Sequence, residues 1–136
     1  MIQRVQTVWM LLAALAAFLT MKFLFYSGTL ISDNQYHPLL ATDHLLILIF
    51  TSALGTGIVI NIFLYKNRKV QSRIILLAVL LECLIIFLYV KQTDQYSAGN
   101  YSLWSALHIL IIIFLLFAAR GIYKDSKLIK DSNRLR

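Results

Sequence analysis

Residues 73–91 read RIILLAVLLECLIIFLYVK, an unbroken apolar segment between Arg73 and Lys91 with one acidic residue, Glu82, at its middle. About 20 helical residues cross the hydrocarbon core of a bilayer, and segments of about 17 are at the short end of the usual range. A helix satisfies its own backbone hydrogen bonds in lipid, where water cannot do so. The segment 74–90 is therefore predicted to be a transmembrane helix.

Three further apolar segments of similar length are present in the chain. They are predicted to span the membrane at residues 5–25, 44–65 and 103–119. None of them shows the alternation of apolar and polar residues that is typical of a barrel strand. We therefore expect an all-α fold, in which residues 1–136 form a single domain, a four-helix transmembrane bundle with up-down topology.

The overall composition agrees with a membrane protein. Of the 136 residues, 60% are hydrophobic and 14% are charged, whereas soluble domains are nearer half apolar and about a quarter charged. The net charge of +7 could indicate nucleic-acid binding in a soluble protein. Because basic residues also collect on the cytoplasmic loops of membrane proteins, we expect no nucleic-acid partner.

The basic residues are distributed unequally between the two sides of the predicted bundle. Of the 13, all but Lys22 and Lys91 lie on the side that carries both chain ends. Lys and Arg favour the cytoplasmic side, so we expect both termini to be cytoplasmic. Residues 120–136 are predicted to form a basic helical tail near the anionic leaflet. The expected cytoplasmic anchors are Lys66, Arg68, Lys69, Arg73, Arg120 and Lys124.

Small residues are predicted to bring the first two helices together. Ala13 and Ala17 lie four residues apart in the first helix, as do Ala53 and Gly57 in the second. This spacing lets helix backbones approach each other closely in lipid. Together with Gly55, these residues are expected to form the packing faces, with a hinge or binding role for the two glycines as the alternative.

Glu82 and His108 are the intramembrane polar candidates. A carboxylate at the centre of the bilayer is costly, so Glu82 is expected to face protein or water rather than lipid. Its expected partners within the bundle are His108, Ser105, Thr51 and Ser52. Two interpretations stay open: a structural hydrogen bond between helices, and a functional contact with a proton, an ion or a partner.

The histidines allow two further interpretations. His44 and His108 could ligate a haem between helices, and with His37 they could form a metal site. Neither arrangement has a diagnostic spacing, so we expect no metal and no cofactor. The sequence shows no nucleophile–base pair, paired carboxylates or phosphate-binding glycine loop, and we therefore expect no enzyme.

Three stretches of the chain together resemble a known family. The opening Met1–Trp9 that runs into Leu11–Ala14, the basic loop Tyr65–Arg73 and the close Ala118–Arg136 are similar to an uncharacterised four-span membrane protein family of the Bacteroidota. The resemblance implies an inner-membrane protein of a diderm bacterium. It gives no catalytic or binding residue to carry over.

The leading functional hypothesis is a non-enzymatic accessory or scaffold subunit of a membrane complex. Its partners would be the lipid bilayer and either another membrane protein or a second copy of the chain. One alternative is a small transporter or proton-coupled carrier centred on Glu82. The other is a haem- or quinone-linked redox subunit.

Overall fold

The structure is a computed structural model that describes the backbone of residues 5–134 and the side chains of residues 5–130. Arg4 and residues 135–136 of the predicted tail lie outside the described residues. Two 3-10 turns, Ala41–Asp43 and Leu103–Ser105, precede α2 and α4. The helices and strands are α1 (Val5–Thr20), β1 (Tyr26–Leu30), β2 (Tyr36–Leu39), α2 (Leu45–Phe63), α3 (Arg68–Thr93), β3 (Tyr96–Tyr101) and α4 (Ala106–Arg134).

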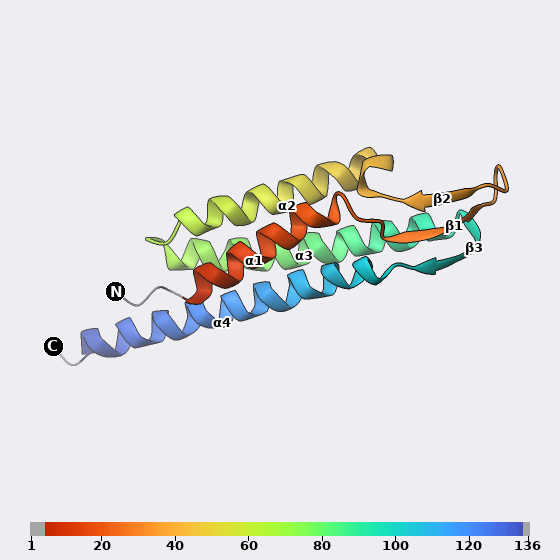
Figure 1. Ribbon diagram of the computed structural model, residues 1–136. Helices are drawn as coiled ribbons and strands as arrows, with labels where there is room; N and C mark the ends of the chain where they lie inside the picture. Colours follow the sequence, from red (N-terminus) through yellow and green to blue (C-terminus); the bar gives the residue numbers. More distant parts are fainter. Residues whose placement is uncertain (1–4, 135–136) are drawn as a thin grey trace.

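The four helices form an elongated bundle with a small sheet at one end (Figure 1). Each helix packs against its neighbours in the chain, and α1 also packs against α4, which closes the ring. The start of α1, the α2–α3 loop and the end of α4 lie together at the end opposite the sheet. The chain therefore runs up and down through the bundle.

Three helices in the described part of the chain are long and apolar enough to cross a membrane. They are α2, α3 and the helical segment Leu103–Lys130. The fourth helix, α1, has 16 residues and spans roughly 24 Å, which is less than the roughly 30 Å of a hydrocarbon core. The predicted span 5–25 is thus wrong in its second boundary, because the helix ends at Thr20 and residues 21–25 lead into β1.

A three-stranded sheet corrects the all-α prediction. Its order is β2-β1-β3, and both neighbouring pairs are antiparallel. The sheet joins the two loops that leave the bundle at this end, so that their backbone groups bond to each other. Gly28 in β1 allows the close approach of β3, because a methyl group there would overlap the Ala98 carbonyl group. These short, polar strands lack the apolar alternation that identifies a half-buried strand in a sequence.

The helices α3 and α4 each turn a narrow stripe toward the bundle interior, with residues alternately three and four apart. The stripe of α3 consists of Gln71, Ile75, Ala78, Glu82, Ile85 and Tyr89. The stripe of α4 includes His108, Ile111, Leu115, Ala118 and Ile122. This spacing is that of helices packed at a small crossing angle. The outward faces carry exposed Leu, Ile, Val and Phe side chains, as surfaces in contact with lipid do.

The contact between α1 and α2 uses a different face of α2 from the predicted one. Ala13 and Ala17 are buried, but Ala53 is exposed and a Cβ at Gly57 would meet nothing within 4 Å. The prediction that Ala53 and Gly57 face α1 is therefore wrong. The helices α1 and α2 approach each other closely at Gly55, because a Cβ there would lie 2.9 Å from Cζ of Phe18 in α1. A helix that is apolar all round gives small residues no preferred face, so their spacing alone could not identify the contact.

The two glycines Gly28 and Gly57 give a matched test of this packing. We expect Gly28→Ala to lower the free energy of unfolding by about 1–3 kcal/mol, because the added methyl group overpacks the sheet against backbone. We expect Gly57→Ala not to lower it and to raise it by up to about 1 kcal/mol, because alanine has a higher helix propensity than glycine and its methyl group would meet open space in α2. Unfolding of the purified chain in a Trp9→Phe background by SDS in mixed micelles, followed by the fluorescence of Trp104, measures both. Equal effects of the two substitutions would contradict the observed sheet.

Candidate functional site

The bundle interior holds a carboxyl group in direct contact with an imidazole. Glu82 Oε1 and His108 Nδ1 lie 2.7 Å apart, and the two side chains are 1% and 4% exposed. Glu82 lies at the middle of α3, and His108 lies in the first turn of α4. Both residues belong to the interior stripes of their helices, so the hydrogen bond joins α3 to α4 inside the bundle.

The other expected partners of Glu82 are engaged elsewhere. Thr51, Ser52 and Ser105 donate their hydroxyl groups to backbone carbonyls three or four residues earlier, at 2.7, 2.9 and 2.7 Å. Such bonds satisfy a hydroxyl group within its own helix or turn. Of the four residues, the structure brings only His108 to Glu82.

Aromatic rings enclose the His108 imidazole. The ring centroids of Phe25 and Tyr89 lie 5.4 and 5.2 Å from that of His108, both in edge-on orientations. The Phe25 and Tyr89 rings stack on each other at 4.3 Å and 16°. The backbone N–H of Phe25, just before β1, donates to the Leu39 carbonyl in β2 at 2.9 Å. The sheet thereby fixes the aromatic side of the site.

Tyr89 adds a hydroxyl group to this region of the bundle. Its side chain is fully buried, and the hydroxyl has no hydrogen-bond partner among the described residues. Tyr89 follows Glu82 by two helical turns on the same stripe, or roughly 10 Å along the axis. A buried polar group without a partner costs about 1–3 kcal/mol and calls for an explanation such as a bound water or ion.

The chemistry available at this site is proton binding. A carboxyl group and an imidazole at hydrogen-bond distance can hold a shared proton on either partner. In apolar surroundings, a single unpaired charge is costly, so a proton that enters or leaves the pair must be balanced nearby. No serine, threonine or cysteine side chain bonds to the pair in the described part of the chain.

The remaining histidines are separate from this pair. His37 and His44 line a different hollow, beside the β1–β2 hairpin, together with Asp43 and Tyr96. Partial burial raises the pKa of Tyr96, and the negative charge of Asp43 raises it further. Within the described residues, no group of three or more His, Cys, Asp or Glu side chains is placed to hold a metal ion. The structure thus does not gather the three histidines considered for a metal site.

A second buried polar contact lies near the other end of the bundle and was missed by the sequence analysis. Asn61 Nδ2 donates to the Gln71 carbonyl, and Gln71 Nε2 donates to the Asn61 carbonyl, both at 3.2 Å. A signal for these residues was available. In a helix that is apolar on all faces, the polar residues mark the interior side, and Gln71, Glu82 and Tyr89 fit one stripe of three- and four-residue steps.

The predicted basic anchors gather at the end of the bundle opposite the sheet (Figure 1). They lie in the α2–α3 loop, the first turns of α3 and the second half of α4. Arg68 is half-buried, and the exposed members are Lys66, Lys69, Arg73, Arg120 and Lys124.

The family described as "Domain of unknown function (DUF4293)" matches residues 2–135 of the chain. The chain belongs to this family. The DUF4293 match covers nearly the whole sequence and supports the resemblance to an uncharacterised family. No curated protein and no solved structure matches the chain. Membership in the DUF4293 family assigns no residue a role, and function has to be inferred from the geometry of the chain itself.

A double-mutant cycle tests the coupling between Glu82 and His108. We expect Glu82→Leu and His108→Leu each to destabilise the bundle, because each leaves the other polar group without its partner. In the double variant, the loss should be smaller than the sum by about 0.5–3 kcal/mol. SDS unfolding in mixed micelles measures the three variants. The control pairs Glu82→Leu with Thr51→Val, which should be additive; additivity for the His108 pair as well would mean that the contact contributes nothing.

Proposed function

We propose that this DUF4293 chain is a four-span protein of a bacterial inner membrane that acts as a non-enzymatic accessory subunit of a membrane complex. Both termini would be cytoplasmic, and the sheet would lie on the opposite side of the membrane. The observation that carries the proposed role is the free edge of β3, which offers a place for a partner protein to add a strand. The partner is either another membrane protein or a second copy of the chain.

The membrane placement is supported by the helices and the charges together. Three helices have the length and apolarity of membrane spans, and α1 is an apolar helix packed beside them. Residues 21–25, which include Phe23 and Phe25, extend the apolar chain beyond α1 toward the sheet. The basic residues concentrate at the end opposite the sheet, and this end is expected to be cytoplasmic. The resemblance to a Bacteroidota family favours a bacterial inner membrane.

The outer edge of β3 has free backbone hydrogen-bonding groups. Among the described residues, β3 pairs with β1 on one side and with no strand on the other. Ser102 N–H donates to the Phe25 carbonyl at 3.0 Å, and antiparallel ladders alternate between bonded and non-bonded pairs. The N–H and C=O groups of Gly99 and Tyr101 therefore point away from β1. A free edge of this kind is a template for strand addition by another chain.

The outward face of α2 supports contact with a partner inside the membrane. Ala53 is exposed, and the space around Gly57 is open. The neighbouring Ile49 and Ile60 are 49% and 59% exposed. Small residues on a lipid-facing surface let a second helix approach closely, and close packing is a main source of helix association in lipid.

Site-specific crosslinking tests orientation and partner together. We expect Asn100→Cys in β3, in a Cys83→Ser background, to react in cells with a maleimide–aryl azide that cannot cross the inner membrane. Illumination should then join the chain to one defined protein, identified by mass spectrometry and absent from the unilluminated sample. Gln35→Cys, in the β1–β2 turn, is the control that should be labelled without forming this adduct. Lys69→Cys, in the first turn of α3, should not be labelled.

The two parts of the proposal fail in different ways. Labelling of Lys69→Cys together with protection of Asn100→Cys would overturn the orientation. Labelling of Asn100→Cys without any adduct, and recovery of a monodisperse, partner-free chain after mild solubilisation, would overturn the accessory role.

A proton-coupled carrier is a second candidate, and the buried pair is the observation that favours it. Glu82 and His108 share a hydrogen bond of 2.7 Å inside the bundle, and the Tyr89 hydroxyl nearby has no partner among the described residues. Ionisable groups within membrane spans commonly lie on proton or ion pathways. A second copy of the chain would supply a second pair.

Proton flux in proteoliposomes tests the carrier. If Glu82 carries protons, wild-type chain should dissipate an imposed pH gradient, reported by a pH-sensitive dye inside the vesicles, and Glu82→Gln should abolish this flux. Asp94→Asn, at an exposed position after α3, removes an acid elsewhere and should leave the flux unchanged. The carrier is excluded if Glu82→Gln and Glu82→Leu both conduct like the wild type, or if the wild type matches empty vesicles.

A further inference from the structure

A hollow of about 710 Å³ opens between α1 and α4 at the basic end of the bundle. α1 begins at Val5, whereas α4 continues to Arg134. The two helices are close where Gly121 faces Gln6, since a Cβ at Gly121 would lie 3.0 Å from Gln6 Cβ. Beyond this point α4 extends past the start of α1 (Figure 1), and the hollow occupies the space that α1 does not cover.

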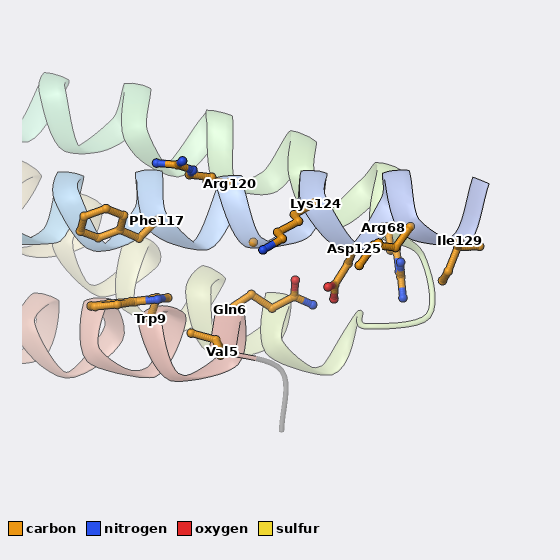
Figure 2. Close-up of a pocket in the computed structure, with 11 residues that line it drawn as sticks. Val5, Gln6, Trp9, Arg68, Phe117, Arg120, Lys124, Asp125 and Ile129 are labelled. Atoms are coloured by element: carbon orange, nitrogen blue, oxygen red, sulfur yellow. The ribbon is translucent and has the colours of Figure 1, made fainter. Parts of the chain in front are cut away.

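Unpartnered polar atoms line this hollow. Gln6 is 2% exposed, and neither its Oε1 nor its Nε2 has a hydrogen-bond partner in the described part of the chain. Nη1 of Arg68, which also lines the hollow, is buried and has no hydrogen-bond partner among the described residues. Figure 2 shows the Gln6 amide pointing from α1 toward the space beside Lys124 and Asp125. Leaving buried polar atoms unpaired costs free energy. An occupant that offers two hydrogen-bond acceptors, for Gln6 Nε2 and Arg68 Nη1, and one donor, for Gln6 Oε1, would pair all three atoms.

The charges around the hollow favour an anionic occupant. Arg68, Arg120 and Lys124 line it, together with one carboxylate, Asp125. No ion pair joins Asp125 to these cations among the described side chains. Three cations and one anion leave an excess of positive charge. Guanidinium and ammonium groups form strong, charge-assisted hydrogen bonds with phosphate oxygens.

The other side of the same hollow is apolar. Trp9 packs on Phe117 with ring centroids 5.0 Å apart. Val5, Phe117 and Leu128 also line the hollow, and they are 61%, 44% and 60% exposed. A small soluble anion would gain no binding energy from these apolar side chains. A phospholipid fits both parts, because its phosphate would meet the cations while an acyl chain lies along the apolar side chains.

We propose that this hollow binds an anionic phospholipid of the cytoplasmic leaflet, with a hydroxylated headgroup of the phosphatidylglycerol type. The phosphate would accept hydrogen bonds from Arg68, Lys124 and the Gln6 amide N–H. A headgroup hydroxyl would donate to Gln6 Oε1. This site rests on the membrane placement proposed above, and it does not depend on the accessory role.

Quenching of Trp9 fluorescence by brominated lipid tests the site in the full chain. Trp104→Phe leaves Trp9 as the single tryptophan. The protein is placed in vesicles that contain a small fraction of brominated phosphatidylglycerol in unlabelled phosphatidylcholine, and then in the reverse mixture. We expect half-maximal quenching at a roughly tenfold lower fraction of brominated phosphatidylglycerol than of brominated phosphatidylcholine, since one charge-assisted hydrogen bond is enough for a tenfold change.

Matched variants separate a built site from general attraction to a basic surface. Lys124→Ala removes a charge that lines the hollow, and Lys127→Ala removes the same charge from an exposed position outside it. We expect Lys124→Ala to abolish most of the preference for phosphatidylglycerol and Lys127→Ala to keep it. Gln6→Leu should weaken the preference while helix content, measured by circular dichroism, stays unchanged.

Three results would overturn the proposal. Equal loss in Lys124→Ala and Lys127→Ala would mean unspecific electrostatic attraction. Equal quenching by the two brominated lipids would mean that the hollow holds water or any lipid. Relief of quenching by glycerol 3-phosphate in the micromolar range would assign the site to a soluble phosphate. Labelling of Lys69→Cys from outside the cell would show a failure of the placement, which is a separate outcome.

Discussion

The hydrogen bond between Glu82 and His108 is the constraint on which the arrangement of the bundle depends. Lipid offers no partner to a carboxyl group, so α3 can be inserted stably only with Glu82 turned inward. The inward orientation of Glu82 determines which face of α3 points into the bundle. Ile75, Ile85 and Tyr89 lie on the same face at helical spacing and are therefore buried with it. On α4, the same bond turns His108 inward and with it the residues that follow at three- and four-residue steps. One polar contact therefore sets the rotation of two long, otherwise apolar helices.

The sheet has a related role at the end of the bundle. Both loops at this end leave apolar helices and carry backbone groups that need hydrogen-bond partners. Pairing β1 with β3 joins loops that are about 70 residues apart in sequence, with Tyr26 opposite Tyr101. Phe25 then stacks on Tyr89 and contacts His108, so that the sheet and the buried pair support each other. The helix α1 ends at Thr20, and residues 21–25 lead the chain to Phe25 at the start of the sheet.

The sequence predicts the helices of this fold better than their faces or the loops. The apolar run around Glu82 is sufficient to predict α3, since only a helix satisfies its backbone in lipid. The faces of α2 could not be predicted from Ala53 and Gly57, because a helix without a polar side shows no apolar periodicity. The sheet was missed because its strands are short and polar, and because β3 pairs with β1 over a long separation. For the site, Glu82 could be found from its cost in lipid, and His108 was one of four equivalent partners until the structure placed it at 2.7 Å.

The depth of a polar group in the bundle decides what it can do. Near the middle of α3, Glu82 has to be paired within the protein, and its hydrogen bond to His108 provides this partner. The bond also leaves both side chains buried and out of contact with solvent. At the basic end, Gln6 and Arg68 carry buried polar atoms that the described protein leaves unpaired. In the proposed membrane placement, headgroups and water lie within reach of these atoms, which is not the case in the hydrocarbon core. A polar side chain of the same type would then hold helices together in the middle of the bundle and be free to bind a ligand at its basic end.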